Sequence, residues 1–385
     1  MNTDPAVSSS DNSSPTDTLA DDRIDTRIDS LIDSIDATSF DNWYREREFA
    51  RNIREGQPYF NGPTSIPTPE RHSPSQLNQC HRKIYYRQLN APEEQPSPQG
   101  IFWTGTKFEE ELVMPYLEAI VGSDGYVRNS MWIDFICETA AGEVRIKGAT
   151  DPVIVNAESE PLLLIESKTK GSLDHLSEPD THHKAQVHAY MYGLTHKYDR
   201  RLTDAILLYG SRTSLDIRVF HISFDPWFWR QTVLAWTGKH TQYRLDEALP
   251  PATPAFGWEC EFCEFKHRCG QTDTVQFTNT GAKGLLPQFD AYPREKVLDY
   301  LDGHDSAKLT PILAHEYPTL VDDYGVYDWI CEACGTQQGW DETDWSGSIL
   351  ELPDCQVCAS QGIPVSLSGP SPATQQELME EAADA

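Results

Sequence analysis

Hydrophobic and polar residues along this chain follow two kinds of pattern, which predict helices and strands. In the clearest helical stretch, apolar residues recur at Ile24, Ile28, Leu31, Ile32 and Ile35, three or four positions apart. Runs rich in β-branched and aromatic residues predict strands. The predicted helices span residues 24–35, 42–55, 102–121, 182–195 and 226–245, and the predicted strands span residues 126–138, 144–155, 162–167, 205–209 and 216–223. From residue 102 onward, this order predicts an α/β fold with a mixed central sheet flanked by helices.

Composition divides the rest of the chain into segments. Residues 1–20 are rich in Ser, Thr, Asp and Pro, and the tail 366–385 is rich in Pro, Ser, Gln and Glu, so both are predicted to be disordered. Residues 21–70 predict a helical extension whose acidic amphipathic helix packs on the main domain or, alternatively, binds a partner. The main domain is expected over 71–270, followed by a mixed connector with helical patches over 271–325.

Two neighbouring predicted strands carry the most informative residues, Asp151 in the first and Glu166 with Lys168 in the second. Residues i and i+2 of a strand share a face, so Glu166 and Lys168 point to one side and Ile165 to the other. Two acids that converge from adjacent strands form an all-oxygen site suited to Mg²⁺ or Mn²⁺, and a lysine beside such an ion orients or deprotonates a water molecule. An exposed hairpin with an ordinary ion pair has the same spacing, so the flanking sequence must decide.

Eight of the nine cysteines fall into ligand-like groups, a pattern that favours metal binding in a reducing compartment over disulfides. The C-terminal group consists of two C-x2-C pairs with twenty residues between them, which is the spacing of a zinc ribbon. Its ligands are Cys331, Cys334, Cys355 and Cys358, and they predict a structural Zn²⁺ within residues 326–365. The ninth cysteine, Cys137, follows a largely apolar run and is expected in the core.

The other group, Cys260, Cys263 and Cys269, has the spacing C-x2-C-x5-C and lacks a fourth cysteine nearby. His267 lies only two residues from Cys269, which makes joint ligation of one zinc ion awkward. The remaining cysteine in a polar setting is Cys80, far upstream in a short helix predicted to begin at a Ser-Pro-Ser sequence.

Charge is unevenly distributed along the chain. The net charge is −29, of which residues 1–40 carry −7 and residues 271–385 carry −16, leaving −6 for residues 41–270. Negative charge on a protein opposes DNA binding, but residues 41–270 carry only a small part of the negative charge of this chain. Acidity spread over the chain also predicts a halophilic host, where molar salt shortens screening to about 3 Å. The absence of a membrane-length apolar run and the polar N-terminus predict a cytoplasmic protein with no membrane partner.

Four motifs follow one another along the chain in an order that is found in a known protein family. They are Ser-Pro-Ser-x-Leu-x-x-Cys-x-Arg-Lys-x-x-Tyr at 73–86, Asp151 with Glu166-x-Lys168, the Q-x3-Y pair Gln186 and Tyr190, and C-x2-C-x5-C at 260–269. The region 72–270 therefore resembles the RecB-like PD-(D/E)xK nucleases that carry a [4Fe-4S] cluster. That family includes the CRISPR-associated exonucleases and the nuclease domain of AddB-type helicase–nucleases.

The resemblance implies a restriction-endonuclease-like core over 71–270 and a role for each matching residue. Asp151 and Glu166 would bind Mg²⁺ or Mn²⁺, helped by the main-chain carbonyl of Ser167, and Lys168 would be the catalytic lysine. Gln186 and Tyr190 would line the site. The cluster ligands implied by the resemblance are Cys80, Cys260, Cys263 and Cys269.

One position departs from the family pattern. The family commonly places a metal-binding His on the helix before the sheet, and this chain has Glu109 there. Glutamate also ligates Mg²⁺ or Mn²⁺, so Glu109 is expected among the metal ligands. Glu110 is a rival for the position, and a solvated acidic helix face is the simplest alternative.

These expectations together predict a divalent-metal-dependent deoxyribonuclease, an exonuclease acting on single-stranded DNA or duplex ends in DNA processing, repair or CRISPR adaptation. No helicase motif is present, so unwinding would come from a helicase or a CRISPR or repair protein partner. Basic residues near the motifs are candidates for phosphate contacts: Arg82, Lys83, Lys168, Lys170, Lys184, Arg200, Arg201, Lys266 and Arg268. One alternative is a nuclease-fold DNA-binding or adaptor protein with weak turnover, favoured by the missing His. The other, an iron–sulfur redox module, gives no role to the acids.

Overall fold

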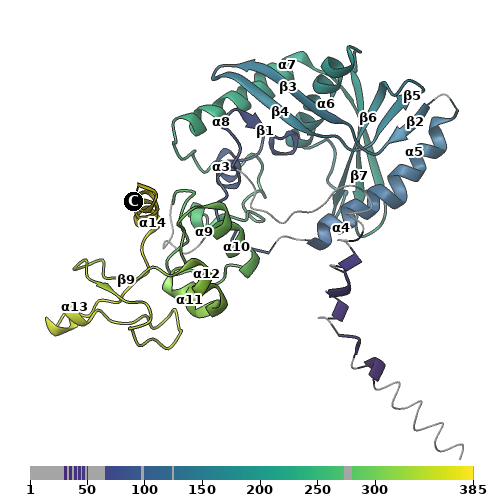
Figure 1. Ribbon diagram of the computed structural model, residues 1–385. Coiled ribbons are helices and arrows are strands. Elements are labelled where there is room, and N and C mark those ends of the chain that lie inside the picture. The colour runs from purple at the N-terminus through teal and green to yellow at the C-terminus, as the bar shows by residue number, and fades with distance from the viewer. Residues whose placement is uncertain are drawn as a thin grey trace, which may run out of the picture. The chain divides into compact units, whose positions relative to one another are not determined.

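The structure is a computed structural model (Figure 1), and it describes residues 66–96, 99–123, 125–272 and 280–384 with short stretches between 30 and 50. The chain divides into two units, Met1–Gly62 and Pro63–Ala385, and the second holds every predicted site residue. The segment 1–20, predicted to be disordered, lies outside the described residues, as does most of the predicted helix at 24–35. Leu31 and Ile32 of that helix are described, and both are helical and exposed.

Two β-sheets form the core of the second unit, where the sequence predicted one. The larger sheet has the order β2-β5-β6-β7-β8, in which β6 and β7 are parallel and the other pairs antiparallel. Its strands are β2 (Gly125–Arg128), β5 (Val153–Asn156), β6 (Pro161–Lys170), β7 (Asp204–Ser211) and β8 (Ile217–Ser223). The smaller sheet pairs β4 with β1 in parallel and with β3 in antiparallel fashion. Its strands are β1 (Arg71–His72), β3 (Trp132–Thr139) and β4 (Gly142–Ala149).

The extra sheet arises because two predicted strands are each broken in the middle. The run 126–138 divides into β2 and β3, and the run 144–155 divides into β4 and β5. Pro152 sits at the second break, where its missing N–H prevents continued pairing. The Thr150 hydroxyl accepts a 3.0 Å hydrogen bond from the Met131 backbone N–H, which ties the two breaks together. Asp151 consequently lies at a corner between the sheets.

Helix α6 (Thr181–Tyr198) lies between the two sheets and contacts β3 on one side and β6 and β7 on the other (Figure 1). Gly193 makes this packing possible, because a Cβ there would lie 2.8 Å from Ile133. The order β6-α6-β7 forms a parallel β-α-β unit. Buried side chains of α6 and both sheets share one hydrophobic core, which includes Cys137 as predicted.

The remaining helices of this region cover the sheets. The predicted helix 102–121 is α4 (Gln99–Phe108), a π-helical turn η2 (Glu109–Val113) and α5 (Met114–Val121), packed on the outer face of the larger sheet. The predicted helix 226–245 is α7 (Pro226–Phe228), the π-helical turn η3 (Trp229–Leu234) and α8 (Ala235–Leu245). Shorter elements are η1 (Pro74–Gln76), α3 (His81–Gln88) and α9 (Lys266–Cys269).

The predicted connector and tail form a small helical core of their own. Its helices are α10 (Arg294–Gly303), α11 (Pro311–Glu316), η4 (Pro318–Leu320), α12 (Val321–Tyr324) and α14 (Pro372–Asp384). The prediction of a disordered tail was therefore wrong for α14. Gln375 is fully buried and exchanges hydrogen bonds with the backbone N–H and carbonyl of Leu285 (2.8 and 2.7 Å), and Met379 one turn later joins the core. Because most residues of the tail are polar, the sequence did not indicate that Gln375 and Met379 form a buried face of a helix.

Between α12 and α14, a short hairpin and one helical turn surround the C-terminal cysteines. The elements are β9 (Trp329–Ile330), β10 (Gln337–Gln338) and α13 (Gln356–Ser360). Trp329 is almost fully buried against the cysteines. Across the described residues, no helix combines the length and apolar character that membrane crossing requires.

Candidate active site and metal centres

The corner between the sheets brings Asp151 and Ser167 together. The backbone N–H of Ser167 donates a 2.9 Å hydrogen bond to Asp151 Oδ2, and its hydroxyl lies 3.3 Å from the same oxygen. The hydroxyl also donates to Glu109 Oε2 over 3.3 Å. Three residues that are far apart in the sequence, Glu109, Asp151 and Ser167, thus converge on one point.

Glu109 reaches this point from the first position of the π-helical turn η2. Pro115 follows two residues after the turn and has no N–H to donate to Glu111, while the Met114 N–H bonds to the carbonyl of Glu109, five residues back. Glu110 turns away and forms a 2.7 Å ion pair with Lys107. Of the two rival acids, Glu109 is the one that faces the site.

Glu166 and Lys168 share a face of β6, as the spacing predicted. Lys168 Nζ lies 2.5 Å from Glu166 Oε1, and the Glu166 side chain is 0% exposed. Within the described part of the chain, neither Glu166 oxygen has a hydrogen-bond partner of normal geometry. A fully buried carboxylate with an unpartnered oxygen is energetically costly, and this cost makes it a candidate metal ligand.

The pKa values of these acids reflect burial and mutual repulsion. Burial, with the neighbouring charge of Asp151, raises the pKa of Glu166 to about 8 and that of Glu109 to about 7. Burial alone would lower the pKa of Lys168, but the charges of Glu166 and Asp151 outweigh it and raise the value above its usual range. These shifts favour the protonated forms of Glu109 and Glu166 and the charged form of Lys168.

Gln186 and Tyr190 lie one turn apart on α6 and form the adjoining wall. Gln186 Nε2 donates a 3.1 Å hydrogen bond to the Tyr190 hydroxyl, and both side chains are buried. Burial and the charge of Glu166 raise the pKa of Tyr190, which places its hydroxyl in the field of the acid. All predicted residues of the acid site are thus brought together by β6, α6, η2 and the β4–β5 corner.

The second candidate centre is a cavity lined by all four cysteines that the family resemblance had grouped: Cys80, Cys260, Cys263 and Cys269. Cys80 was expected inside a helix, but it is the N-cap residue of α3. Asn78, with φ of 58°, is in the left-handed region and separates η1 from α3. Burial raises the pKa of all four thiols, and that of Cys263 reaches about 12.

Spacing distinguishes this group from the C-terminal one. In the C-terminal quartet, Cys331 Sγ lies 3.7 Å from Cys358 Sγ, and Cys334 Sγ lies 3.6 Å from Cys355 Sγ. These are separations that one tetrahedral ion with ~2.3 Å bonds requires. The described side-chain groups whose ligand atoms all lie within 4.8 Å of one another include this quartet but not the Cys80 group. The C-terminal quartet can hold one metal ion, whereas the sulfur atoms of the Cys80 group do not all lie within 4.8 Å of one another.

Two buried acids hold the Cys80 group in place. Glu259 accepts hydrogen bonds from the backbone N–H groups of Cys80 (2.8 Å) and Ala255 (2.6 Å). Glu94 accepts from His267 and Arg268, both over 2.7 Å, at the start of α9. The ring of His267 packs on Phe289 and does not line the cavity.

Sequence reasoning missed a further cluster at the start of α6, formed by Asp180, His182 and His183. Their ligand atoms lie within 4.8 Å of one another. Asp180 is already paired with Lys170 over 2.7 Å, and His183 Nδ1 lies 2.9 Å from the Tyr209 hydroxyl. Burial and the charges of Lys168 and Lys170 lower the pKa of His182 to about 4, despite the opposing charge of Asp180. In the sequence, the adjacent His182 and His183, one helical turn before Gln186, could have indicated this cluster.

Several of the basic residues predicted to contact phosphates have structural partners. Arg268 is fully buried and donates to the carbonyls of Gly281 and Gly284. Arg82 is buried and donates to the carbonyl of Pro250. Lys184 lies over the ring of Phe228. Lys168 and Lys170 remain near the acid site.

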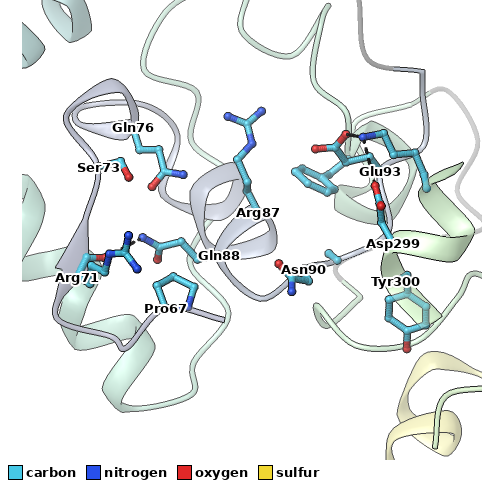
Figure 2. Close-up of a pocket in the computed structure, with 13 residues that line it drawn as sticks. Pro67, Arg71, Ser73, Gln76, Arg87, Gln88, Asn90, Glu93, Asp299 and Tyr300 are labelled. Carbon is cyan, nitrogen blue, oxygen red and sulfur yellow. Dashed lines mark hydrogen bonds and ion pairs between the residues drawn. The ribbon is translucent and has the colours of Figure 1, made fainter. Parts of the chain in front are cut away.

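A larger cavity adjoins the cysteine cavity, with which it shares the wall residue Phe265. Figure 2 shows this pocket of about 480 Å³ between the α3 region and α10, where Lys296 pairs with Glu93 over 2.8 Å. Its labelled lining includes Arg71, Gln76, Arg87, Gln88, Asp299 and Tyr300. None of the residues predicted to form a catalytic or metal site lines this pocket.

Comparison with known proteins adds little to this picture. No family model and no curated protein matches the sequence. The chain is similar to the crystal structure of SSO0001, with 18% sequence identity over 61% of this chain and 100% of that one, at a TM-score of 0.40.

Proposed function

We propose that this protein is a divalent-metal-dependent deoxyribonuclease with a restriction-endonuclease-like core. One observation carries the proposal: Glu109, Asp151 and Glu166 converge beside Lys168, and Glu166 is buried with an unpartnered oxygen. Clustered carboxylates beside a lysine, with raised pKa values at Glu109 and Glu166, are typical of sites that bind Mg²⁺ or Mn²⁺.

The proposed ligands are Glu109, Asp151, Glu166 and the Ser167 carbonyl. A bound divalent ion would supply Lewis-acid stabilisation of the phosphate and lower the pKa of an attacking water. The Ser167 N–H fixes the orientation of the Asp151 carboxylate. Lys168, which lies beside Glu166, would orient the water and stabilise developing negative charge. Gln186 and Tyr190 position the substrate at the adjoining wall.

The cysteine groups receive different cofactors in this proposal. Cys80, Cys260, Cys263 and Cys269 would hold a [4Fe-4S] cluster, because they line one cavity and their sulfur atoms are not all within 4.8 Å of one another, which suits a multi-atom centre better than one tetrahedral ion. Cys331, Cys334, Cys355 and Cys358 would hold one structural Zn²⁺. The cluster would join chain segments on both sides of the nuclease core.

The second candidate is a DNA-binding protein of the same fold with little turnover. It is favoured by Glu109, which stands where the resembled family carries His and adds a third acid to a crowded site. DNA binding at high salt without cleavage by the wild type would favour it over the nuclease.

The nuclease is tested by measuring cleavage of end-labelled DNA with Mg²⁺ or Mn²⁺ by the wild type, Glu166→Gln and Lys168→Met. Glu110→Gln is the matched control, because Glu110 is an acid next to Glu109 that pairs with Lys107 instead. The expected result is metal-dependent cleavage that both site variants lose and the control retains. Full cleavage by Glu166→Gln would reject the mechanism.

A further inference from the structure

A chain of aromatic rings leads away from the acid site along the protein surface. His182 lies one turn before Gln186 on α6, and its ring stacks on Phe256 with 4.9 Å between ring centroids. Phe256 contacts Trp258 at 4.5 Å, and Trp258 meets Phe262 at 6.2 Å. These four residues, termed the aromatic track below, connect the catalytic wall to the loop that carries Cys260 and Cys263.

The outer half of the aromatic track is open to solvent. The side chain of Trp258 is 46% exposed and that of Phe262 is 69% exposed. Exposed large aromatic side chains that form a contiguous row mark an interaction surface more often than isolated ones do. A partner with flat apolar faces would complement this row of rings.

Positive charge accompanies the aromatic track. Lys170 Nζ lies 5.6 Å from the Trp258 ring centroid and also pairs with Asp180. Lys83, beside the cysteine cavity, lies 3.8 Å from Glu264. Because each cation already faces an acid, charge alone would give weak attraction to phosphates, and the rings must supply most of the affinity.

We propose that the aromatic track stacks the unpaired bases of a single DNA strand and guides that strand to the acid site. Base–aromatic stacking tolerates any sequence because every base has a π-face, whereas the bases of a duplex are covered by their neighbours. The inference rests on the proposed nuclease function and adds the strand-binding surface to it. It assigns Trp258 and Phe262 as positioning residues that do not touch the reacting phosphate.

The test is fluorescence anisotropy of a labelled oligothymidylate, an abasic strand of equal length and a hairpin duplex, measured without divalent ions. Trp258→Ala and Phe262→Ala are compared with Trp132→Ala, a control on β3 that is 60% exposed and outside the aromatic track. Each track variant should bind oligothymidylate about tenfold or more weakly than the wild type. The abasic strand should bind the wild type weakly and show no further loss in the variants.

The same preparations separate this inference from the proposed function. Melting temperature and visible absorbance of the variants establish that the fold is retained, and Phe262→Ala, at the most exposed position, serves if Trp258→Ala is unstable. Wild-type cleavage together with unchanged oligothymidylate affinity in both variants would overturn the aromatic track and leave the nuclease standing. An equal loss of affinity for the duplex would also overturn it, and a wild type that neither binds nor cleaves DNA would overturn both.

Discussion

Glu259 Oε1 accepts a 2.8 Å hydrogen bond from the backbone N–H of Cys80, 179 positions earlier in the sequence. Its second oxygen accepts from Ala255, so one buried carboxylate fastens the start of α3 to the loop before Cys260. The two halves of the cysteine group are therefore aligned by a protein contact as well as by any bound cofactor.

Replacing Glu259 should disturb the cysteine group without touching a ligand. Glu259→Ala removes two hydrogen bonds to a buried charge, each of roughly 1.5–3 kcal/mol, and should lower both the melting temperature and the visible absorbance per protein. Glu261→Ala, a neighbouring exposed acid, is the control and should change neither. Normal absorbance in Glu259→Ala would show that the cofactor, and not this contact, assembles the site.

Glu109 should behave as a metal ligand. Glu109→Ala should weaken Mn²⁺ binding and cleavage by more than the roughly 10–100-fold that follows loss of an outer-shell partner, because the side chain faces Asp151 through the Ser167 hydroxyl. Isothermal titration with Mn²⁺ measures the binding directly. If Glu110→Ala causes the larger loss, the assignment of the two acids is reversed.

Acid should destabilise the fold through two buried histidines. Burial lowers the pKa of His72 to about 3 and that of His240 to about 2, from the ordinary 6.5. Both stay neutral in the folded state while the unfolded chain takes up protons, so stability is full above pH 6.5 and falls as the pH drops below it. Urea unfolding from pH 7.5 to 5 measures this slope.

A single variant, compared with the wild type, identifies the source of that slope. His240→Gln should flatten the pH dependence relative to the wild type, even if it lowers stability overall, because the buried ring is then absent from both states. An unaltered slope in His240→Gln would assign the acid sensitivity to other groups.

The segment around the C-terminal cysteine quartet should need a bound metal for its folding, whatever the state of the acid site. Cys355→Ser should lower zinc content by one ion per chain and loosen the segment around β9, because the fully buried Cys355 and Trp329 pack together. Elemental analysis and limited proteolysis report the two effects. Cys137→Ser, in the main core, should leave the zinc content unchanged.

Two pairs of residues in the acid site were predictable from short-range spacing, whereas their convergence with Asp151 and Glu109 was expected only from the family resemblance. The i, i+2 spacing placed Glu166 and Lys168 on one face, and the i, i+4 spacing placed Gln186 beside Tyr190. The choice of Glu109 over Glu110 required the structure, because a π-helical turn changes which residue faces inward.

Features that depend on long-range contacts were not predictable. The second sheet arises because the chain breaks at Pro152 and near Met131. Both breaks lie inside sequence runs that looked like single continuous strands. Helix α14 is stabilised by the bonds of Gln375 to Leu285, ninety positions away in sequence. The aromatic track joins α6 to the loop around Trp258, more than seventy positions later, so no local sequence pattern could predict it.

The central claim is tested most directly by one measurement, the rate at which wild-type protein and Glu166→Gln degrade a 5′-labelled single strand with Mn²⁺ in molar salt. The account predicts cleavage by the wild type that stops when the metal is chelated, and none by a correctly folded Glu166→Gln that still binds the strand. Equal rates in the two proteins, or binding without any cleavage by the wild type, would contradict it.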